Sequence, residues 1–328
     1  DLLRNTLMII EKSNKFDLHV IITGSHLKKE FGNTAKIIKN DNYKKIIEID
    51  ILNSKNNKKS TAIAISKGIK LFTNFFYQNN INILLILGDR FEILSAAISS
   101  HALGLLTIHF SGGDTSLGSL DNQYRDAISI MSSIHFVKTK GHKDKLLKLG
   151  INKNEIEVIG SLSIDNYKNY TKMSLKKINN KFSIDIKNHF VLASFPPVTN
   201  PSSNNDNDVG IFLDSLLEVK DMYYVFTASN IDSGGQEINK KIKKWVSINS
   251  QISCYVESFG KDAYFSLLSK ADLMIGNSSS GIIESAIFKL PAINILPRQE
   301  GRSHNSNIIN TLNIKNKIIK SIYLARET

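Results

Sequence analysis

Short apolar runs alternate with longer amphipathic stretches along the whole chain, and this alternation restricts the fold more than any other feature of the sequence. The runs have the length of buried strands, and the stretches between them place apolar residues at the spacing of one helix face. Strands that alternate with helices form parallel sheets that carry helices on both faces. We therefore predict an α/β fold built from doubly wound parallel sheets.

The predicted elements form two series, separated by a polar stretch rich in lysine and asparagine at 166–188. In the first series, strands are expected at 18–23, 81–87, 105–110, 134–137 and 157–159, and helices at 61–78, 90–103, 121–131 and 143–149. In the second series, strands are expected at 190–194, 223–227, 253–256, 273–275 and 292–295, and helices at 211–219, 236–248, 261–269 and 281–289. A polar loop is expected at 201–208.

A chain of 328 residues suits two domains, each large enough for its own core. We place the boundary in the polar stretch, which gives an N-terminal Rossmann-like domain at 1–175 and a C-terminal one at 176–328. Two such domains are expected to face each other across a cleft. Ligands of open α/β sheets bind beyond the carboxyl ends of the strands, so the loops after those strands are the candidate sites.

The formal net charge of +12 comes mostly from lysines scattered over the chain. They predict a solvated basic surface that attracts an anionic substrate, because no basic run is interleaved with aromatic residues for nucleic-acid bases to stack on. The longest apolar run, 83–87, is too short to span a bilayer, so no membrane partner is expected. The single cysteine, Cys254, excludes an internal disulfide and argues against a zinc site. We expect a cytoplasmic protein.

The strongest local signal is the segment GNSSSG at 276–281, which follows an apolar strand and precedes a helix. Glycine permits close approach of the backbone, serine hydroxyls donate hydrogen bonds, and a helix N-terminus presents free N–H groups. This combination suits a diphosphate, and the carboxylate one turn into the helix can accept from both ribose hydroxyls. The alternative is a serine N-cap with an acidic first turn. The residues assigned to the nucleotide are Ser278, Ser279, Ser280, Gly281 and Glu284.

A second candidate site is the loop GDRFE at 88–92, directly after the most buried strand. A carboxylate and a guanidinium in this position, at Asp89 and Arg90, are costly to place without a purpose. The alternative is a helix N-cap at Asp89 with Glu92 as its capping-box partner. Both interpretations can hold at once, with Asp89 serving as cap and as catalytic group.

A third candidate site is the block SGGDTSLGSLDNQYRD at 111–126, which follows the strand predicted at 105–110. Asp121 and Arg125 are four residues apart, so they share a helix face and can pair. After a glycine-rich loop at a strand end, they are predicted to orient a substrate or to tune the pKa of a carboxylate. His109 is equally well explained as a hydrogen-bonded histidine at the end of the strand.

A fourth candidate site is the loop RQEGR at 298–302, after the last predicted strand. The guanidinium groups of Arg298 and Arg302 flank a glycine turn and suit an anion. The alternative is a basic surface loop.

Taken together, these segments resemble the UDP-N-acetylglucosamine 2-epimerases, specifically the hydrolysing branch that feeds sialic-acid and legionaminic-acid synthesis. The matching segments keep the order of the family over most of the chain. They are GDRFE at 88–92, SGGDTSLGSLDNQYRD at 111–126, Gly160-Ser161, PVT at 197–199, NIDSGG at 230–235, GNSSSGIIE at 276–284 and RQEGR at 298–302.

The resemblance implies two Rossmann-like domains, as in the GT-B glycosyltransferases, with the nucleotide held mainly by the second. It also implies a reaction on a UDP-linked, N-acetylated amino sugar. A base removes the proton at C2 while UDP leaves C1, and water then adds to the resulting glycal with inversion at C2. Asp89 and Asp121 would be the acid/base carboxylates, and Arg125 would steer charge.

The resemblance also assigns residues to the substrate and the nucleotide: Arg90, Glu92, Asp114, Asn230, Ser278, Ser279, Ser280, Gly281, Glu284, Arg298 and Arg302. No metal and no redox cofactor are implied. Relatives are commonly oligomeric, so a homo-oligomer is expected.

The chain departs from the family pattern at four points. The histidine that usually precedes Pro-Val-Thr is Pro196, which can neither transfer a proton nor donate a hydrogen bond. Asp126 stands where a histidine usually follows the arginine, and Ser111 stands where some relatives have a glutamate. The sequence also begins downstream of the family's first strand and ends before its closing helices. We expect a diverged nucleotide-sugar enzyme seen without its ends.

Three alternatives to the hydrolysing 2-epimerase stay open at the level of sequence. A non-hydrolysing epimerase would leave the sugar attached to UDP. A GT-B glycosyltransferase would share the nucleotide site but would require an acceptor. A catalytically impaired nucleotide-sugar binder would explain Pro196.

Overall fold

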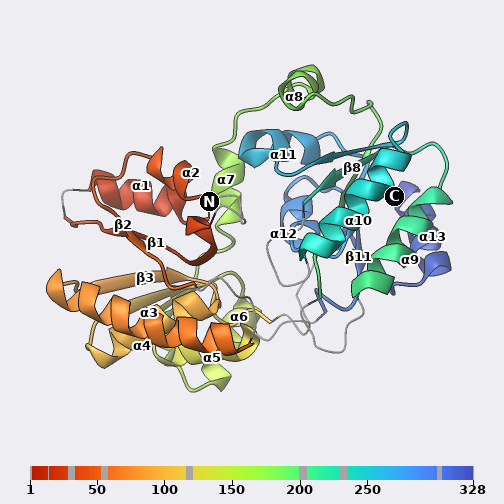
Figure 1. Ribbon diagram of the computed structural model, residues 1–328. Helices are drawn as coiled ribbons and strands as arrows, with labels where there is room; N and C mark the ends of the chain where they lie inside the picture. The colour runs from red at the N-terminus through yellow and green to blue at the C-terminus, as the bar shows by residue number, and fades with distance from the viewer. Residues whose placement is uncertain are drawn as a thin grey trace. The chain divides into compact units, whose positions relative to one another are not determined.

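The computed structural model describes residues 2–13, 15–28, 34–52, 58–115, 121–198, 205–228, 235–300 and 305–327, without the side chains of Lys58, Asp121, Asn166 and Asn205 (Figure 1). The chain folds into two compact units. Unit 1 comprises Asp1–Asp114 and Leu120–Leu162, and unit 2 comprises Thr115–Ser119 and Ser163–Thr328. No helix in the described ranges is long and apolar enough to cross a membrane.

Unit 1 contains two parallel sheets. A two-stranded sheet pairs β1 (Val20–Thr23) with β2 (Ile46–Ile49), and a four-stranded sheet has the order β3-β4-β5-β6. Its strands are β3 (Ile83–Leu87), β4 (Leu106–Phe110), β5 (Ile134–Val137) and β6 (Ile156–Val158). The helices of the unit are α1 (Arg4–Lys12), α2 (Ala35–Lys39), α3 (Lys58–Gln78), α4 (Phe91–Ala102), α5 (Asp121–Ile130) and α6 (Lys140–Lys148), with short 3₁₀ turns at Gly24–Leu27 and Lys153–Glu155.

The core of unit 1 forms where α3 and α4 cover the strands. Aromatic and aliphatic side chains of these elements pack with β2 and α5, and the buried residues are Ile49, Ile51, Phe72, Phe76, Leu84, Ile86, Ala96, Ala97 and Ile128. Because β3 and β4 are adjacent and parallel, with Leu87 opposite Phe110, their carboxyl ends lie at the same edge of the sheet. Of the predicted catalytic residues, Asp89 lies in the loop after β3, and Asp121 and Arg125 belong to α5, the helix that follows β4.

Unit 2 is a six-stranded parallel sheet with the order β12-β11-β10-β7-β8-β9. The strands are β7 (Val191–Ser194), β8 (Tyr224–Thr227), β9 (Ser253–Val256), β10 (Leu273–Gly276), β11 (Ala292–Ile295) and β12 (Ile308–Thr311). The chain runs outward from β7 to one edge, returns to the middle at β10, and runs outward to the other edge. This is the doubly wound order, whose switch point between β7 and β10 is where such sheets bind ligands.

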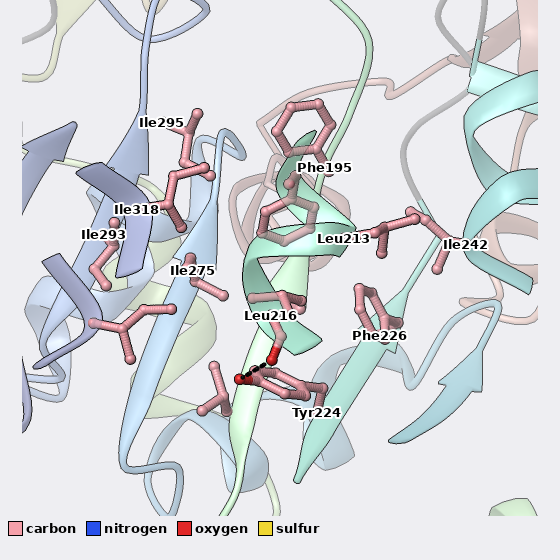
Figure 2. Close-up of a cluster of buried hydrophobic side chains, with 14 of the residues drawn as sticks. Phe195, Leu213, Leu216, Tyr224, Phe226, Ile242, Ile275, Ile293, Ile295 and Ile318 are labelled. Carbon is pink, nitrogen blue, oxygen red and sulfur yellow. Dashed lines mark hydrogen bonds between the residues drawn. The ribbon is translucent and has the colours of Figure 1, made fainter. Parts of the chain in front are cut away.

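Helices cover both faces of this sheet, as Figure 1 shows. Alternate strand residues pack on α9 (Asn205–Leu217), α10 (Gly235–Ile248) and α13 (Lys315–Arg326) on one face. The intervening residues pack on α8 (Leu175–Phe182), α11 (Gly260–Leu268) and α12 (Ser280–Ile287) on the other face. Figure 2 shows the first of these two cores, in which the Tyr224 hydroxyl donates to the carbonyl of Leu216 at 3.1 Å.

Every predicted strand is present, with its ends shifted by at most two residues. Two strands and several helices were not predicted. β2 and β12 stand among lysines and asparagines, and the polar stretch at 166–188 contains α8, whose Ile178 is fully buried. The loop predicted at 201–208 is wrong for residues 205–208, because α9 already begins at Asn205.

Helix α7 (Ser163–Lys168) precedes the boundary that the sequence predicts but lies within unit 2. The reason is aromatic packing. The rings of Tyr167 and Tyr170 stack with centroids 5.8 Å apart, and both meet Phe288, at 5.2 and 6.3 Å.

Candidate functional site

The loops after β7 and β10 meet at the switch point of unit 2. Gly276, the last residue of β10, lies so close to β7 that a Cβ at this position would be 1.8 Å from the carbonyl oxygen of Ser194. Only glycine fits such an approach. The next residue, Asn277, donates its backbone N–H to the same carbonyl at 3.2 Å. The GNSSSG turn therefore starts directly beside the end of β7.

Three further hydrogen bonds hold this turn, and a fourth holds Arg298 to the loop after β7. The Asn277 side chain donates to the carbonyl of Pro196 at 2.9 Å, and the Asn277 carbonyl accepts from Gln299 Nε2 at 3.0 Å and from Arg298 Nη1 at 3.2 Å. Arg298 Nε donates to the carbonyl of Pro197 at 3.1 Å. Arg298, predicted as an anion ligand, thus links the loops after β7, β10 and β11. Pro196 is buried in this network.

The serines occupy the start of α12. Ser279 is at the N-cap position and its hydroxyl makes no capping hydrogen bond, but Ser278 Oγ accepts from the backbone N–H of Ser280 at 3.3 Å. A serine hydroxyl therefore does bond to the start of the helix, which agrees with the capping alternative as well as with an anion site. Ser280 Oγ lies 2.6 Å from the hydroxyl of Tyr264 on α11. Gly276, Ser278 and Gly281 lie around a gap beside Asn294 of β11 that is too narrow for a water molecule. The turn therefore combines hydroxyls, glycines and a helix N-terminus, as an anion site requires.

Glu284 lies one turn into α12. Its Oε1 accepts a hydrogen bond of 2.9 Å from Ser163, the first residue of α7. Ser163 is 4% exposed, and no local pattern in the sequence indicated that α7 would reach this helix. The contact fixes one oxygen of the carboxylate predicted to bind the ribose.

In unit 1, Asp89 and Arg125 form an ion pair between the end of β3 and α5. The Arg125 side chain is 6% exposed and that of Asp89 is 21% exposed. The capping interpretation of Asp89 is wrong, because α4 begins at Phe91 and its N-cap residue is Arg90, which makes no side-chain capping bond. The carboxylate is directed to the guanidinium of α5 instead.

Arg125 also organises the loop after β4. Its Nη1 donates to the carbonyl of Asp114 at 2.7 Å and to Asn122 Oδ1 at 3.0 Å. The Asp114 carboxylate is buried and forms an ion pair with Lys138 at 3.0 Å. Its other oxygen lies 3.8 Å from Nε2 of His142. Sequence reasoning missed Lys138 and His142, because they lie on the next β–α connection and form no local motif.

Asp126, which replaces a histidine of the family pattern, pairs with Lys145 of α6 at 2.9 Å. Both side chains are partly exposed, at 29% and 27%. Exposed pairs of this kind contribute at most about 1 kcal/mol. The aspartate therefore has a structural partner on the neighbouring helix.

Glu92 is buried and accepts from Arg90 Nε at 3.2 Å. Its carboxylate packs against Gly24, in the turn that follows β1. His26 of the same turn has a pKa lowered by partial desolvation and by the Arg90 guanidinium, whereas Glu92 acts in the opposite direction. Sequence reasoning missed this turn, although Gly24 and His26 directly follow a predicted strand.

His109 of β4 lies fully buried between two elements of this site. Its Nε2 is 2.8 Å from the carbonyl of Gly88, and its Nδ1 is 3.1 Å from Ser129 Oγ on α5. Burial, with a smaller contribution from the nearby His135, lowers the pKa of His109 to about 4, although the hydrogen bond to Gly88 raises it. The imidazole is therefore neutral near pH 7.

Three predicted residues lie outside the described part of the structure. They are Asn230, Arg302 and the side chain of Asp121, so the pairing of Asp121 with Arg125 stays a prediction. Within the described ranges, no group of three His, Cys, Asp or Glu side chains could hold a metal ion.

A doubly wound sheet with a serine-rich turn at its switch point is an arrangement in which α/β proteins commonly bind nucleotides. Comparison with known proteins makes this specific: the profile of the UDP-N-acetylglucosamine 2-epimerase family matches residues 8–328. The chain is also 34% identical, over 94% of its length and 80% of the relative's, to the GDP/UDP-N,N'-diacetylbacillosamine 2-epimerase (hydrolyzing) of Campylobacter jejuni. The chain belongs to the UDP-N-acetylglucosamine 2-epimerase family.

Other relatives agree with this assignment. The UDP-N,N'-diacetylbacillosamine 2-epimerase (hydrolyzing) of Legionella pneumophila is 30% identical, over 94% of this chain and 81% of the relative. Among solved structures, the Neisseria meningitidis UDP-GlcNAc 2-epimerase bound to UDP-GlcNAc superimposes with a TM-score of 0.79 at 15% identity, covering 98% of this chain and 86% of that one. At this identity the structural likeness establishes the two-domain Rossmann-like fold.

Proposed function

We propose that this protein is a hydrolysing 2-epimerase that converts a UDP-linked, N-acetylated amino sugar into UDP and the free 2-epimer, in the cytoplasm, for the synthesis of sialic-type acids. The observation that carries the proposal is the 34% identity, over 94% of the chain, to an enzyme named as a hydrolysing 2-epimerase. The name of that relative makes a diacetylated, UDP-linked sugar the first substrate to test.

In the proposed reaction, unit 2 binds the nucleotide. The hydroxyls and N–H groups at the start of α12 would hold the diphosphate, and Glu284 would hold the ribose. Because Ser163 already donates to Glu284 Oε1, the carboxylate is oriented before the ligand arrives.

Unit 1 would supply the proton transfers. A carboxylate of the pair Asp89 and Asp121 removes the C2 proton, the electron pair forms the C1–C2 double bond, and UDP leaves with the C1–O electrons. Water then adds its hydroxyl at C1 and a proton returns to C2 from the opposite face. Arg125, paired with Asp89, orients that carboxylate and carries positive charge beside it.

The test is incubation with UDP-N,N'-diacetylbacillosamine and, separately, UDP-N-acetylglucosamine, with chromatography of nucleotide and sugar products. We expect free UDP and a free 2-epimer. An epimerised sugar still attached to UDP would identify a non-hydrolysing epimerase, and UDP release only with an added acceptor would identify a glycosyltransferase.

Pro196 favours one further candidate, a protein that binds the nucleotide sugar without turnover. Its carbonyl is engaged by Asn277 and its ring carries no proton to transfer. Such a protein would gain thermal stability from UDP but release no UDP from either substrate, and Pro196→His alone would not restore turnover.

A further inference from the structure

The peptide before Asp89 is fixed by two consecutive residues of β4. The backbone N–H of Gly88 donates to the carbonyl of Phe110 at 3.1 Å, and the carbonyl of Gly88 lies 2.8 Å from Nε2 of His109. Gly88 has a φ of +87°, a conformation that other residues rarely adopt. The direction in which the chain enters Asp89 therefore depends on this pair of contacts.

The hydrogen bonds of His109 also determine its tautomer. A carbonyl oxygen only accepts, so Nε2 must carry the ring proton. In a neutral imidazole Nδ1 then has no proton, so it accepts from the hydroxyl of Ser129, 3.1 Å away. The ring thus has one donor and one acceptor, each used once, and it is fully buried.

Ser129 lies four residues after Arg125 on α5, so the two side chains share a face of the helix. His109 consequently contacts both sides of the ion pair: the Gly88 peptide that precedes Asp89, and the helix that carries Arg125. The glycine after Ser111 completes the packing, because a Cβ at Gly112 would lie 2.9 Å from Ser129 Oγ and 3.2 Å from His109 Nδ1.

We propose that His109 is a positioning residue that sets the geometry of the Asp89–Arg125 pair, by donating to Gly88 and accepting from Ser129. This inference rests on the proposed function, because it assigns the pair to the reaction. His109 does not itself exchange protons with the substrate. Its two nitrogens are occupied by protein atoms, and burial keeps the ring neutral at the pH of an assay.

Two substitutions separate the contacts of His109. A glutamine places an amide N–H at about the position of Nε2 and can still donate to Gly88, whereas an asparagine is too short to reach that carbonyl. We expect His109→Asn to lower kcat by about 100-fold, the loss that a displacement of about 1 Å causes in an active site. His109→Gln should keep most of the kcat, and the Kd for UDP should be unchanged in both variants.

Thr107→Val is the matched control. Thr107 lies two residues before His109 on the same face of β4, is fully buried, and shares a hydrogen bond of 2.7 Å with Ser100. Loss of this hydrogen bond in Thr107→Val should lower the melting temperature without changing kcat.

Ser129→Ala is the mild variant of the His109 contacts. It keeps the hydrogen bond from His109 to Gly88 but removes the one to Nδ1, so we expect a smaller loss of kcat than with His109→Asn. ¹⁵N NMR of the His109 ring in the wild-type chain should show the Nε2–H tautomer.

Several results would overturn the proposal. If His109→Asn or, should that variant not fold, Ser129→Ala lowers only the melting temperature and not kcat, the role is structural. A His109→Gln variant as slow as His109→Asn would also overturn the proposal. If the pH–rate profile of His109→Gln also lost one limb, His109 would have a direct role in proton transfer. The Nδ1–H tautomer would contradict the hydrogen-bond assignment. Absence of UDP release from the wild-type protein would instead reject the proposed function, while the NMR result would still test the geometry.

Discussion

Asp89 and Arg125 belong to different elements and are 36 residues apart, yet they form the charged pair at the carboxyl edge of β3 and β4. We predict that Asp89→Asn lowers kcat at least about 100-fold, because the amide cannot act as a base. The amide can still accept from the guanidinium, and the nucleotide is assigned to unit 2, so the Kd for UDP should stay the same. Steady-state kinetics and UDP titration measure the two quantities.

Asp126→Asn is the control for this substitution. It removes a carboxylate that lies one residue after Arg125 on α5 and pairs with Lys145 of α6. Its kcat should remain close to the wild-type value. Equal losses in the two variants would show that Asp89 has no special role.

Protonation of His109 should make the free energy of unfolding depend on pH. Its pKa is about 4 in the folded chain, against an ordinary value of 6.5. The unfolded chain therefore binds more protons between these values, so the stability from a neutral His109 is complete above pH 6.5 and is lost as the pH falls towards 4. The contribution is about 3 kcal/mol.

Urea unfolding at pH 7 and pH 4.5 measures this effect. The wild-type chain should lose more stability than His109→Gln between the two pH values, since other titrating groups, including His135, are common to both chains. Equal losses would mean that His109 is not buried as a neutral ring.

At the scale of elements, α11 contacts the start of α12 through Tyr264 and Ser280. Burial raises the pKa of Tyr264, so its hydroxyl keeps its proton. If Ser280 donates to a phosphate, it must accept from Tyr264. We predict that Tyr264→Phe weakens UDP binding by about 5- to 10-fold, the value of one hydrogen bond, but leaves uridine binding unchanged. Calorimetric titration with both ligands checks the difference.

Tyr224→Phe provides the comparison, because it removes the hydroxyl that donates to Leu216 in the other core of unit 2 (Figure 2). It should affect stability but neither ligand. If Tyr264→Phe weakens UDP and uridine equally, the contact supports the fold and does not position the diphosphate turn.

The sequence predicted elements wherever burial is continuous along the chain. The strands of unit 2 are buried on both faces, so they stand out as apolar runs. β12 lies at a sheet edge with Asn310 among its four residues, and α8 contains three lysines and two asparagines beside the buried Ile178, so neither produced a strong pattern. Local composition fails at these two elements because polar residues interrupt their apolar pattern.

The sequence motifs predicted which residues belong to the candidate site, but not which residues they contact. Asp89, Arg125 and Glu284 were identified because charged residues follow buried strands or glycine turns. Their partners could not be identified, because Ser163 is 121 residues from Glu284 and no periodic pattern records such a distance. The capping interpretation of Asp89 failed for the same reason: the long-range pair with Arg125 outweighed a local bond.

At the scale of the whole molecule, the two units can be followed separately by spectroscopy. The single tryptophan, Trp245, lies in the core of unit 2, with its ring 6.4 Å from Tyr224 and 5.5 Å from Phe226. We predict that UDP raises the midpoint of the tryptophan fluorescence transition. At 100 times its Kd, the ligand adds about 2.7 kcal/mol to the free energy of unfolding of the unit that binds it.

Asp89→Asn should show the same shift, because its substitution lies in unit 1. Far-UV circular dichroism reports the helices of both units and serves as the reference. A UDP-dependent change in circular dichroism with an unchanged fluorescence midpoint would place the nucleotide away from unit 2.

The hydrogen bonds that Asn277 shares with Pro196, Arg298 and Gln299 have a kinetic consequence. These bonded residues, which follow three neighbouring strands, are held in place when the sheet folds, so their conformational entropy is lost during folding and not when a ligand arrives. A site ordered in advance needs no slow rearrangement after encounter. Association of UDP with this turn should therefore follow a single exponential whose rate constant rises linearly with ligand concentration, without a plateau.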